Sequence, residues 1–183
     1  MNIMTRANSL VLWEEVVKEA EKDCAVKLEH ELEAYLTSLL FHYTDKPAAL
    51  SGVLATSFLK ALQSTPHQRD YSLQQVGDQC LLLTGLFPRA ANRRCVRIRY
   101  FVDLGQTAYS AISKANGLNG LYRDLSVQFV LLMDILQSIR QFPDLLPLEA
   151  YEQWHELGSQ RAYRLLQSYT AGIPFKMNRS PLK

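Results

Sequence analysis

Apolar side chains recur at helical spacing along almost the whole chain, and this period constrains the fold more than any other feature. The cleanest run lies in residues 118–139, where the spacing alternates between four and three. Its apolar positions are Leu118, Tyr122, Leu125, Phe129, Leu132, Leu136 and Ile139. Only residues 95–101 approach the alternation of a strand, and we assign them to the start of a helix. The sequence therefore predicts an all-α fold, an irregular helical bundle of about seven helices.

Residues that begin and end helices divide this pattern. Thr65 followed by Pro66 predicts an N-cap and a first-turn proline, and Pro88 is expected to end that helix. Ser9 is the expected N-cap of the first helix. Pro147 is expected to begin the seventh and last helix.

The fourth, fifth and sixth helices are expected to lie at the centre of the bundle. Residues 80–87 of the fourth helix are apolar on nearly all sides, so that part of the helix needs cover all round. Gly105 falls on the apolar face of the fifth helix, where glycine costs about 1 kcal/mol relative to alanine. A close crossing by another helix is the simplest explanation of that glycine.

Length and composition predict an ordinary globular protein. The chain has 183 residues, of which 48% are hydrophobic and 21% charged. We expect one helical domain over residues 1–172 and a basic tail over residues 173–183. Three cysteines without a CxxC pair fit a reduced, cytoplasmic compartment. The first nine residues lack the apolar core of a signal peptide, and the most apolar stretch, residues 127–139, is too short to span a bilayer.

Charge is segregated along the chain, although the formal net charge is only +2. Residues 14–33 carry eight acids against three lysines, whereas residues 89–99 carry five arginines and no acid. Arginines bind phosphates and carboxylates, and neighbouring aromatic rings can stack on a ligand. The anion-binding candidates are Arg93, Arg94, Arg97 and Tyr100. The alternative, which we favour because charge runs are usually solvated or paired, is that the arginines face the acidic helices within the fold or across a dimer.

Two aspartates, Asp78 and Asp103, stand in otherwise apolar runs. The helical period places each nearly opposite the main apolar stripe of its helix, which predicts exposure. If both helices are covered on both sides, the carboxylates are buried and need partners such as an arginine or a tyrosine hydroxyl. The alternative to exposure is therefore a buried polar network of Asp78, Asp103 and Tyr109.

Motifs for metal binding and catalysis are sparse. Glu152 and His155 form the one Glu-x-x-His pair, and a di-iron site needs that motif twice together with two further glutamates. The chain has no Gly-x-Ser-x-Gly elbow and no phosphate-binding glycine loop. His42, near the edge of an apolar stripe, is expected to be partly buried. The sequence predicts no metal and no cofactor, and it favours a protein without catalysis.

Two stretches in the middle of the chain resemble a family of uncharacterised bacterial helical proteins. Residues 76–88 read VGDQCLLLTGLFP, and residues 93–109 contain RRCV and YFVDLGQTAY. The resemblance implies a bacterial origin and an all-helical fold, and it implies no reaction because that family has no established activity. The positions that it singles out are Gly77, Asp78, Gly85, Pro88, Arg93, Arg94, Asp103, Gly105 and Tyr109.

Three functions remain open at the level of sequence. The leading expectation is a cytoplasmic interaction or regulatory module without catalysis, which self-associates or binds a protein partner. The runner-up binds, or acts on, an anionic small molecule beside Arg93 and Arg94. Nucleic-acid binding through residues 89–99 is the weakest of the three, because the net charge is small.

Overall fold

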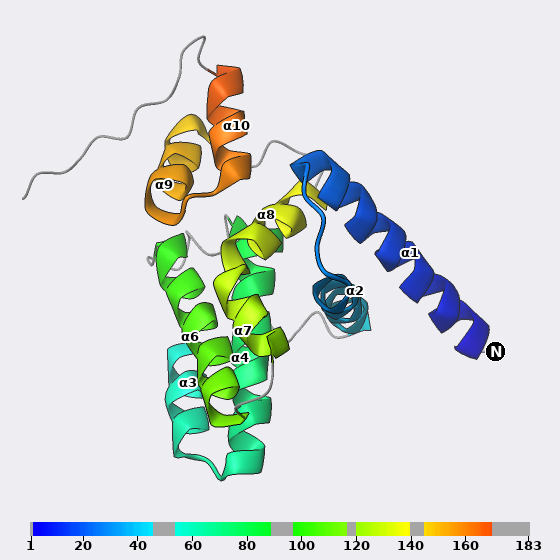
Figure 1. Cartoon of the computed structure of the whole chain (residues 1–183), viewed down its shortest axis with the longest axis vertical. Coiled ribbons are helices and arrows are strands. Elements are labelled where there is room, and N and C mark those ends of the chain that lie inside the picture. Colours follow the sequence, from blue (N-terminus) through cyan, green and yellow to red (C-terminus); the bar gives the residue numbers. More distant parts are fainter. Residues whose placement is uncertain (1, 46–53, 89–96, 117–119, 140–144, 170–183) are drawn as a thin grey trace, which may run out of the picture.

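The regular elements of the chain are α-helices throughout the part that the structure describes. The computed structural model describes residues 2–45, 54–88, 97–116, 120–139 and 145–169, which form nine helices (Figure 1). These are α1 (Asn2–Cys24), α2 (His30–Asp45), α3 (Leu54–Gln63), α4 (Pro66–Leu86), α6 (Ile98–Asn116), α7 (Gly120–Val127), α8 (Phe129–Ile139), α9 (Pro147–Leu157) and α10 (Gln160–Tyr169). The all-α class predicted from the apolar period is confirmed.

The described residues form more helices than the seven expected, because two long helices are interrupted. The helix expected over residues 118–139 is divided at Gln128 into α7 and α8, although the amide of Gln128 still donates to the carbonyl of Asp124. The helix expected after Pro147 is divided at Gly158, which ends α9 in a left-handed conformation with φ of 77°. Glycine adopts this conformation without the steric cost of a Cβ atom.

The prolines predicted helix ends correctly, whereas the first cap was wrong. Pro66 is the first residue of α4, Pro147 is the first residue of α9, and α4 ends two residues before Pro88. Ser9 caps no helix, because α1 begins at Asn2 and continues through it.

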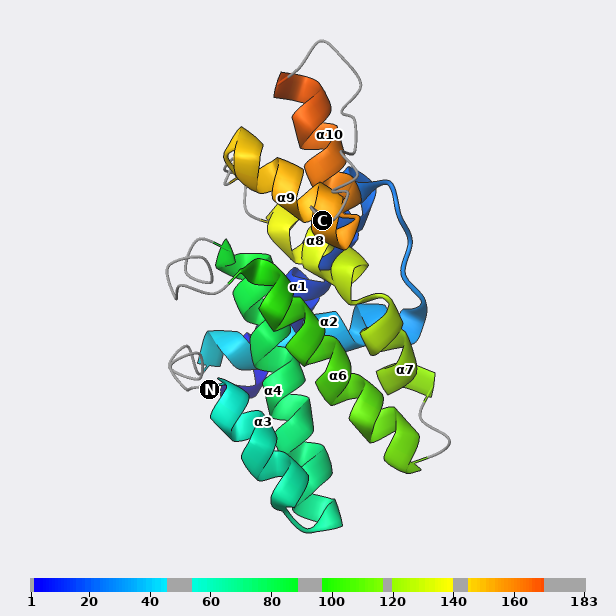
Figure 2. The same ribbon diagram turned by 90° about the vertical axis from the view of Figure 1, so that its left-hand side faces the viewer.

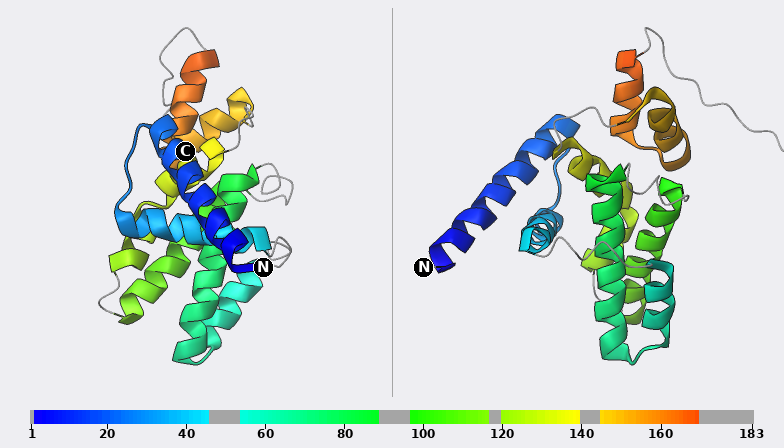
Figure 3. Two further views of the ribbon diagram at one scale, coloured as in Figure 1. Left: turned by 90° about the vertical axis from the view of Figure 1, so that its right-hand side faces the viewer. Right: turned by 180° about the vertical axis from the view of Figure 1, so that it is seen from behind.

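The centre of the molecule is built on α4 and α6, which pack along each other. The outer side of α4 is covered by α3, while α7 packs on α6 and α8 packs on α4 (Figures 1 and 2). On the opposite side lie α1 and α2, and α2 runs across α4 (Figure 3, left). The buried apolar residues of α1, α2, α3, α4, α6, α7 and α8 form one core. No helix in the described residues is long and apolar enough to cross a membrane.

Glycines allow the central helices to approach closely. A Cβ atom on Gly105 would lie 2.5 Å from the ring of Phe129 and 2.9 Å from the Cβ atom of Cys80. On Gly85 it would lie 2.5 Å from the Cβ atom of Leu136. The close crossing predicted at Gly105 is confirmed, since α4 and α8 both meet α6 there.

The pair α9–α10 has a small apolar cluster of its own, and a carboxylate of α8 helps to join the pair to that helix. Asp134 of α8 accepts hydrogen bonds from the hydroxyl of Ser159 (2.6 Å) and from the amides of Gln160 (3.0 Å) and Arg161 (3.2 Å). The hydroxyl of Ser159 also accepts from the amide of Ala162 (3.0 Å). These donors are the otherwise unpaired amides at the start of α10. Asp134 therefore caps α10 from a different part of the chain.

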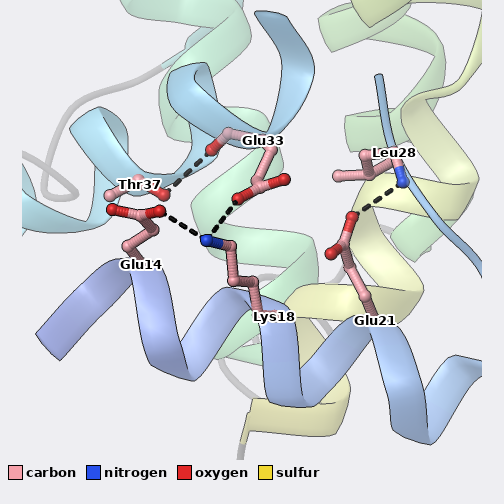
Figure 4. Close-up of polar contacts among 6 residues, drawn as sticks. All are labelled: Glu14, Lys18, Glu21, Leu28, Glu33 and Thr37. Carbon is pink, nitrogen blue, oxygen red and sulfur yellow. Dashed lines mark hydrogen bonds and ion pairs between the residues drawn. The ribbon is translucent and has the colours of Figure 1, made fainter. Parts of the chain in front are cut away.

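Among the described residues, one ion pair links the acidic helices α1 and α2 (Figure 4). Lys18 lies between Glu14 (2.5 Å) and Glu33 (3.6 Å), one from each helix. Glu21 accepts a hydrogen bond from the amide of Leu28 (2.7 Å), which fixes the connection between the helices. Lys18 thus supplies positive charge beside the acidic helices, a role that the sequence predicts for the arginines of residues 89–99.

Candidate functional site

The arginine cluster is only partly within the described residues, and Arg93 and Arg94 lie outside them. Arg97 forms an ion pair with Glu156 of α9 (2.9 Å), and Arg99 lies 3.6 Å from Asp103 one turn along α6. Both arginine side chains are more than half exposed. These two arginines therefore form their ion pairs with α9 and α6, and not with α1 or α2.

Asp103 and Tyr100 lie on the surface of α6. The side chain of Asp103 is 60% exposed and pairs with Arg99, so Asp103 does not belong to a buried polar network. Tyr100 is 40% exposed, with its ring against Phe101. The face of α6 that carries Asp103 is exposed to solvent. The alternative prediction that Asp103 is buried is therefore wrong.

Asp78 lies on α4 at the point where α2 and α6 meet it. Its Oδ1 atom accepts a hydrogen bond from the hydroxyl of Tyr35 of α2 (2.5 Å) and another from Tyr109 of α6 (2.7 Å). Asp78 and Tyr109 are thus hydrogen-bonded to each other, and the third member of the polar network is Tyr35 instead of Asp103. Tyr35 was missed because it falls in the apolar stripe of its helix, where a tyrosine reads as core.

A glycine and a set of ring contacts hold this geometry. Tyr109 is fully buried, and its ring passes so close to α4 that a Cβ atom on Gly77 would lie 2.5 Å from it. The ring of Tyr35 packs edge-to-face on Tyr109 (centroids 6.4 Å apart) and on Tyr122 (6.5 Å). Aromatic pairs favour this arrangement. The two hydroxyls are therefore positioned by the core and not by a surface loop.

Burial shapes the protonation of this cluster. It raises the pKa of Asp78 to about 6, and the hydrogen bonds from Tyr35 and Tyr109 oppose that rise because they favour the carboxylate. Burial, followed by the charge of Asp78, raises the pKa of both tyrosines well above 10. The hydroxyls consequently stay protonated, and Asp78 is mainly ionised at neutral pH. None of the described ion pairs involves Asp78.

Asp78 lines a hollow of about 410 Å³ between α2 and α4, which we call the α2–α4 groove. The groove is bordered by aromatic, amide and hydroxyl side chains. Its lining residues are Tyr35, Ser38, Leu39, His42, Tyr43, Tyr71, Gln74, Gln75, Asp78, Gln79 and Leu82. His42 is exposed, in contrast to the expectation of partial burial, and its Nδ1 atom lies 2.7 Å from the carbonyl of Ser38. Among the described lining residues, Asp78 is the only carboxylate, and lysine and arginine are absent.

A second hollow of about 420 Å³ lies between the end of α1, α8 and α10. Several of its polar groups are engaged: Asp134 caps α10, Arg161 donates to Gln137 (3.2 Å), and Arg164 donates to the carbonyl of Asp23 (3.3 Å). These bonds hold α10 on the body of the protein, so this hollow has fewer groups left for a ligand.

The described residues offer little for metal or nucleophilic chemistry. They contain no group of three or more histidine, cysteine or acidic side chains placed to hold a metal. His155 stacks on Tyr151 (5.5 Å). Cys80 is fully buried, and desolvation raises its pKa to about 12, so its thiol stays protonated. Neither of these features forms a reactive centre.

Comparisons with protein families, with curated proteins and with solved structures found no match to this chain. The fold and the site define a helical protein with an aromatic groove around one carboxylate.

Proposed function

We propose that this chain is a small-molecule-binding protein and that its site is the α2–α4 groove. The observation that carries the proposal is the carboxylate of Asp78 at the groove. Both of its hydrogen bonds from described residues reach Oδ1, and Oδ2 receives none from them. Asp78 is partly buried, so its Oδ2 atom stays open to water and is the natural contact for a ligand that enters the groove.

The size and lining of the groove support this function. Sites for small molecules are typically concave, about 300–1,000 Å³ in volume, and aromatic with a few placed polar groups. The groove has a volume of about 410 Å³ and combines tyrosine rings with three glutamine amides. Because Tyr35 and Tyr109 are fixed in the core, Asp78 is positioned before a ligand arrives, which reduces the cost of binding.

An anionic ligand, the alternative expected from the sequence, fits this groove less well. The groove's described lining contains Asp78 and only one basic side chain, His42. Binding also suits a regulatory module, since a ligand in the groove would bridge α2 and α4.

Ligand-observed NMR with a library of small soluble fragments tests the proposal. Ser38 lines the groove, whereas Thr56 is exposed on α3 away from it. We expect fragments that bind the wild-type chain to lose binding in Ser38→Trp and to keep it in Thr56→Trp. Native mass spectrometry of freshly purified protein should show the same pattern for any ligand that co-purifies. Equal fragment binding by the two variants, or no fragment binding by the wild type, would refute the proposal.

A second candidate function is self-association through α1. Leu10, Val11 and Leu12 are 43%, 53% and 60% exposed, and the N-terminal end of α1 extends away from the other helices (Figure 3, right). Residues 8–13 carry no charge. A symmetric dimer uses the same patch twice, so an uncharged ridge avoids placing like charges opposite each other. The occupant that fits is a second copy of this chain.

Light scattering tests this second candidate. The wild-type chain should be a dimer at micromolar concentration, and Leu12→Gln should shift it to the monomer. Lys22→Gln, an exposed change farther along α1, should leave the dimer intact. A monomeric wild-type chain would exclude the candidate.

A further inference from the structure

We infer that the ligand of the α2–α4 groove is an organic cation, an ammonium group on an apolar or aromatic body, with Asp78 as its counter-ion. This inference rests on the proposed function and deepens it by giving the ligand its charge. Four observations carry it: the charge of the lining, the Oδ2 atom of Asp78 that no described residue reaches, the aromatic walls, and the contrast with Asp134.

The charge of the groove is negative. The titratable groups that face Asp78 are tyrosines from every helix packed around it, together with His42 of α2. They are Tyr35 of α2, Tyr71 of α4, Tyr109 of α6 and Tyr122 of α7. The tyrosines are neutral, and His42 is solvent-exposed. The carboxylate is therefore the dominant charge that a ligand meets, and in a partly enclosed groove its field is weakly screened.

The Oδ2 atom of Asp78 receives no hydrogen bond from the described residues, so a ligand in the groove can donate to it. A carboxylate only accepts hydrogen bonds, and Tyr35 and Tyr109 already supply Oδ1. An ammonium group would donate to Oδ2 in a charge-assisted hydrogen bond, which is roughly twice as strong as a neutral one. A carboxylate or phosphate on the ligand would instead be repelled.

Aromatic rings border the groove on both helices. Tyr35 and Tyr43 come from α2 and Tyr71 from α4, and Tyr43 also packs on Phe87 (centroids 5.9 Å apart). The faces of such rings attract cations. An organic cation can thus satisfy the carboxylate and the rings together.

Asp134, which is buried whereas Asp78 is partly buried, shows what a structural carboxylate looks like in this protein. Asp134 uses both oxygens, accepting from Ser159 on one and from the amides of Gln160 and Arg161 on the other. Asp78 accepts hydrogen bonds from the described residues on one oxygen only. Taking a charge partly out of water costs stability, and such groups concentrate at functional sites. A bound cation would offset that cost.

Three probes of matched shape test the charge of the ligand: 2-phenylethylamine, 2-phenylethanol and 3-phenylpropionate. Titration calorimetry should give the amine about tenfold or more tighter binding than the alcohol, and no binding of the propionate. Asp78→Asn should weaken the amine about tenfold and leave the alcohol within about twofold. Asp103→Asn, the same change on the exposed face of α6, should alter neither. Amine affinity should also fall about tenfold from pH 7 to pH 5, as Asp78 gains a proton.

The outcomes separate this inference from the proposed function. Equal binding of amine and alcohol, unaffected by Asp78→Asn, would overturn the cation and leave the groove as a ligand site. Tighter binding of the propionate would overturn the cation in favour of an anion. Failure of all three probes at millimolar concentration would count against the groove itself. Circular dichroism checks the fold of Asp78→Asn, and the comparison of amine with alcohol on the wild-type chain decides the matter without any variant.

Discussion

Replacing Asp78 by asparagine should make the protein more stable at neutral pH. The amide oxygen of asparagine can still accept from Tyr35 and Tyr109, so the hydrogen bonds of the site are retained. The change removes a carboxylate whose pKa burial raises from an ordinary 3.8 to about 6. At 1.36 kcal/mol per pKa unit, that difference corresponds to up to about 3 kcal/mol.

The sign of this effect follows from proton binding. Between about pH 4 and pH 6 the folded chain keeps the proton of Asp78, whereas the unfolded chain has released it. The contribution of Asp78 to stability is therefore greatest below pH 4, falls as the pH rises to 6, and is constant above pH 7. Asp78→Asn lacks this titration, so its advantage over the wild type should grow by about 3 kcal/mol over the same range.

Urea unfolding from pH 4 to pH 8 measures the prediction. The free energy of unfolding of Asp78→Asn minus that of the wild type should rise through pH 5 and then level off. A gain of 3 kcal/mol corresponds to roughly 6–12 °C in Tm for a chain of this length. Other groups cancel in the difference, and Asp103→Asn serves as the control. A difference that stays flat, or that falls as the pH rises, would refute the reasoning.

Three further changes test the packing and the helix junctions. Gly77→Ala should cost about 2 kcal/mol and perturb the near-ultraviolet circular dichroism of Tyr109, because the new methyl group would overlap a fully buried ring; an unchanged spectrum and Tm would contradict the packing described. Asp134→Ala should cost about 3 kcal/mol by urea unfolding, since it leaves the donors at the start of α10 unpaired; a loss below 1 kcal/mol would show that the cap contributes little. Arg97→Ala should change the free energy of unfolding by less than about 0.5 kcal/mol, because its ion pair with Glu156 is solvent-exposed on the arginine side; a large loss would mean that this pair is shielded from water.

Local signals in the sequence predicted the all-α class and several helix ends. Pro66 and Pro147 begin helices, and Gly105 marks a close crossing, because each of these residues acts through its own backbone. The interruptions at Gln128 and Gly158 were not predicted. The apolar stripe continues across both positions, since the helices on either side still face apolar neighbours, and periodicity alone cannot distinguish one helix from two.

The candidate site depended on information that no single helix contains. Asp78 and Asp103 have the same pattern, each opposite the apolar stripe of its own helix. They differ because α2 covers that side of α4 near Asp78, whereas the corresponding side of α6 near Asp103 is open. Tyr35, which provides the cover, lies 43 positions from Asp78 along the chain. Burial was therefore decided by a long-range contact.

The carboxylate that joins α10 to α8 also affects how the protein opens. The helices α9 and α10 share an apolar cluster of five buried residues, separate from the main core. Contiguous segments of this kind often unfold as one cooperative unit, at a lower free energy than the whole molecule. The amides of α9 and α10 should therefore exchange together and before those of α4. The hydrogen bonds of Asp134 should set the difference in opening free energy between the two units. The α2–α4 groove lies outside that unit. We therefore expect α9 and α10 to unfold locally while the groove stays folded.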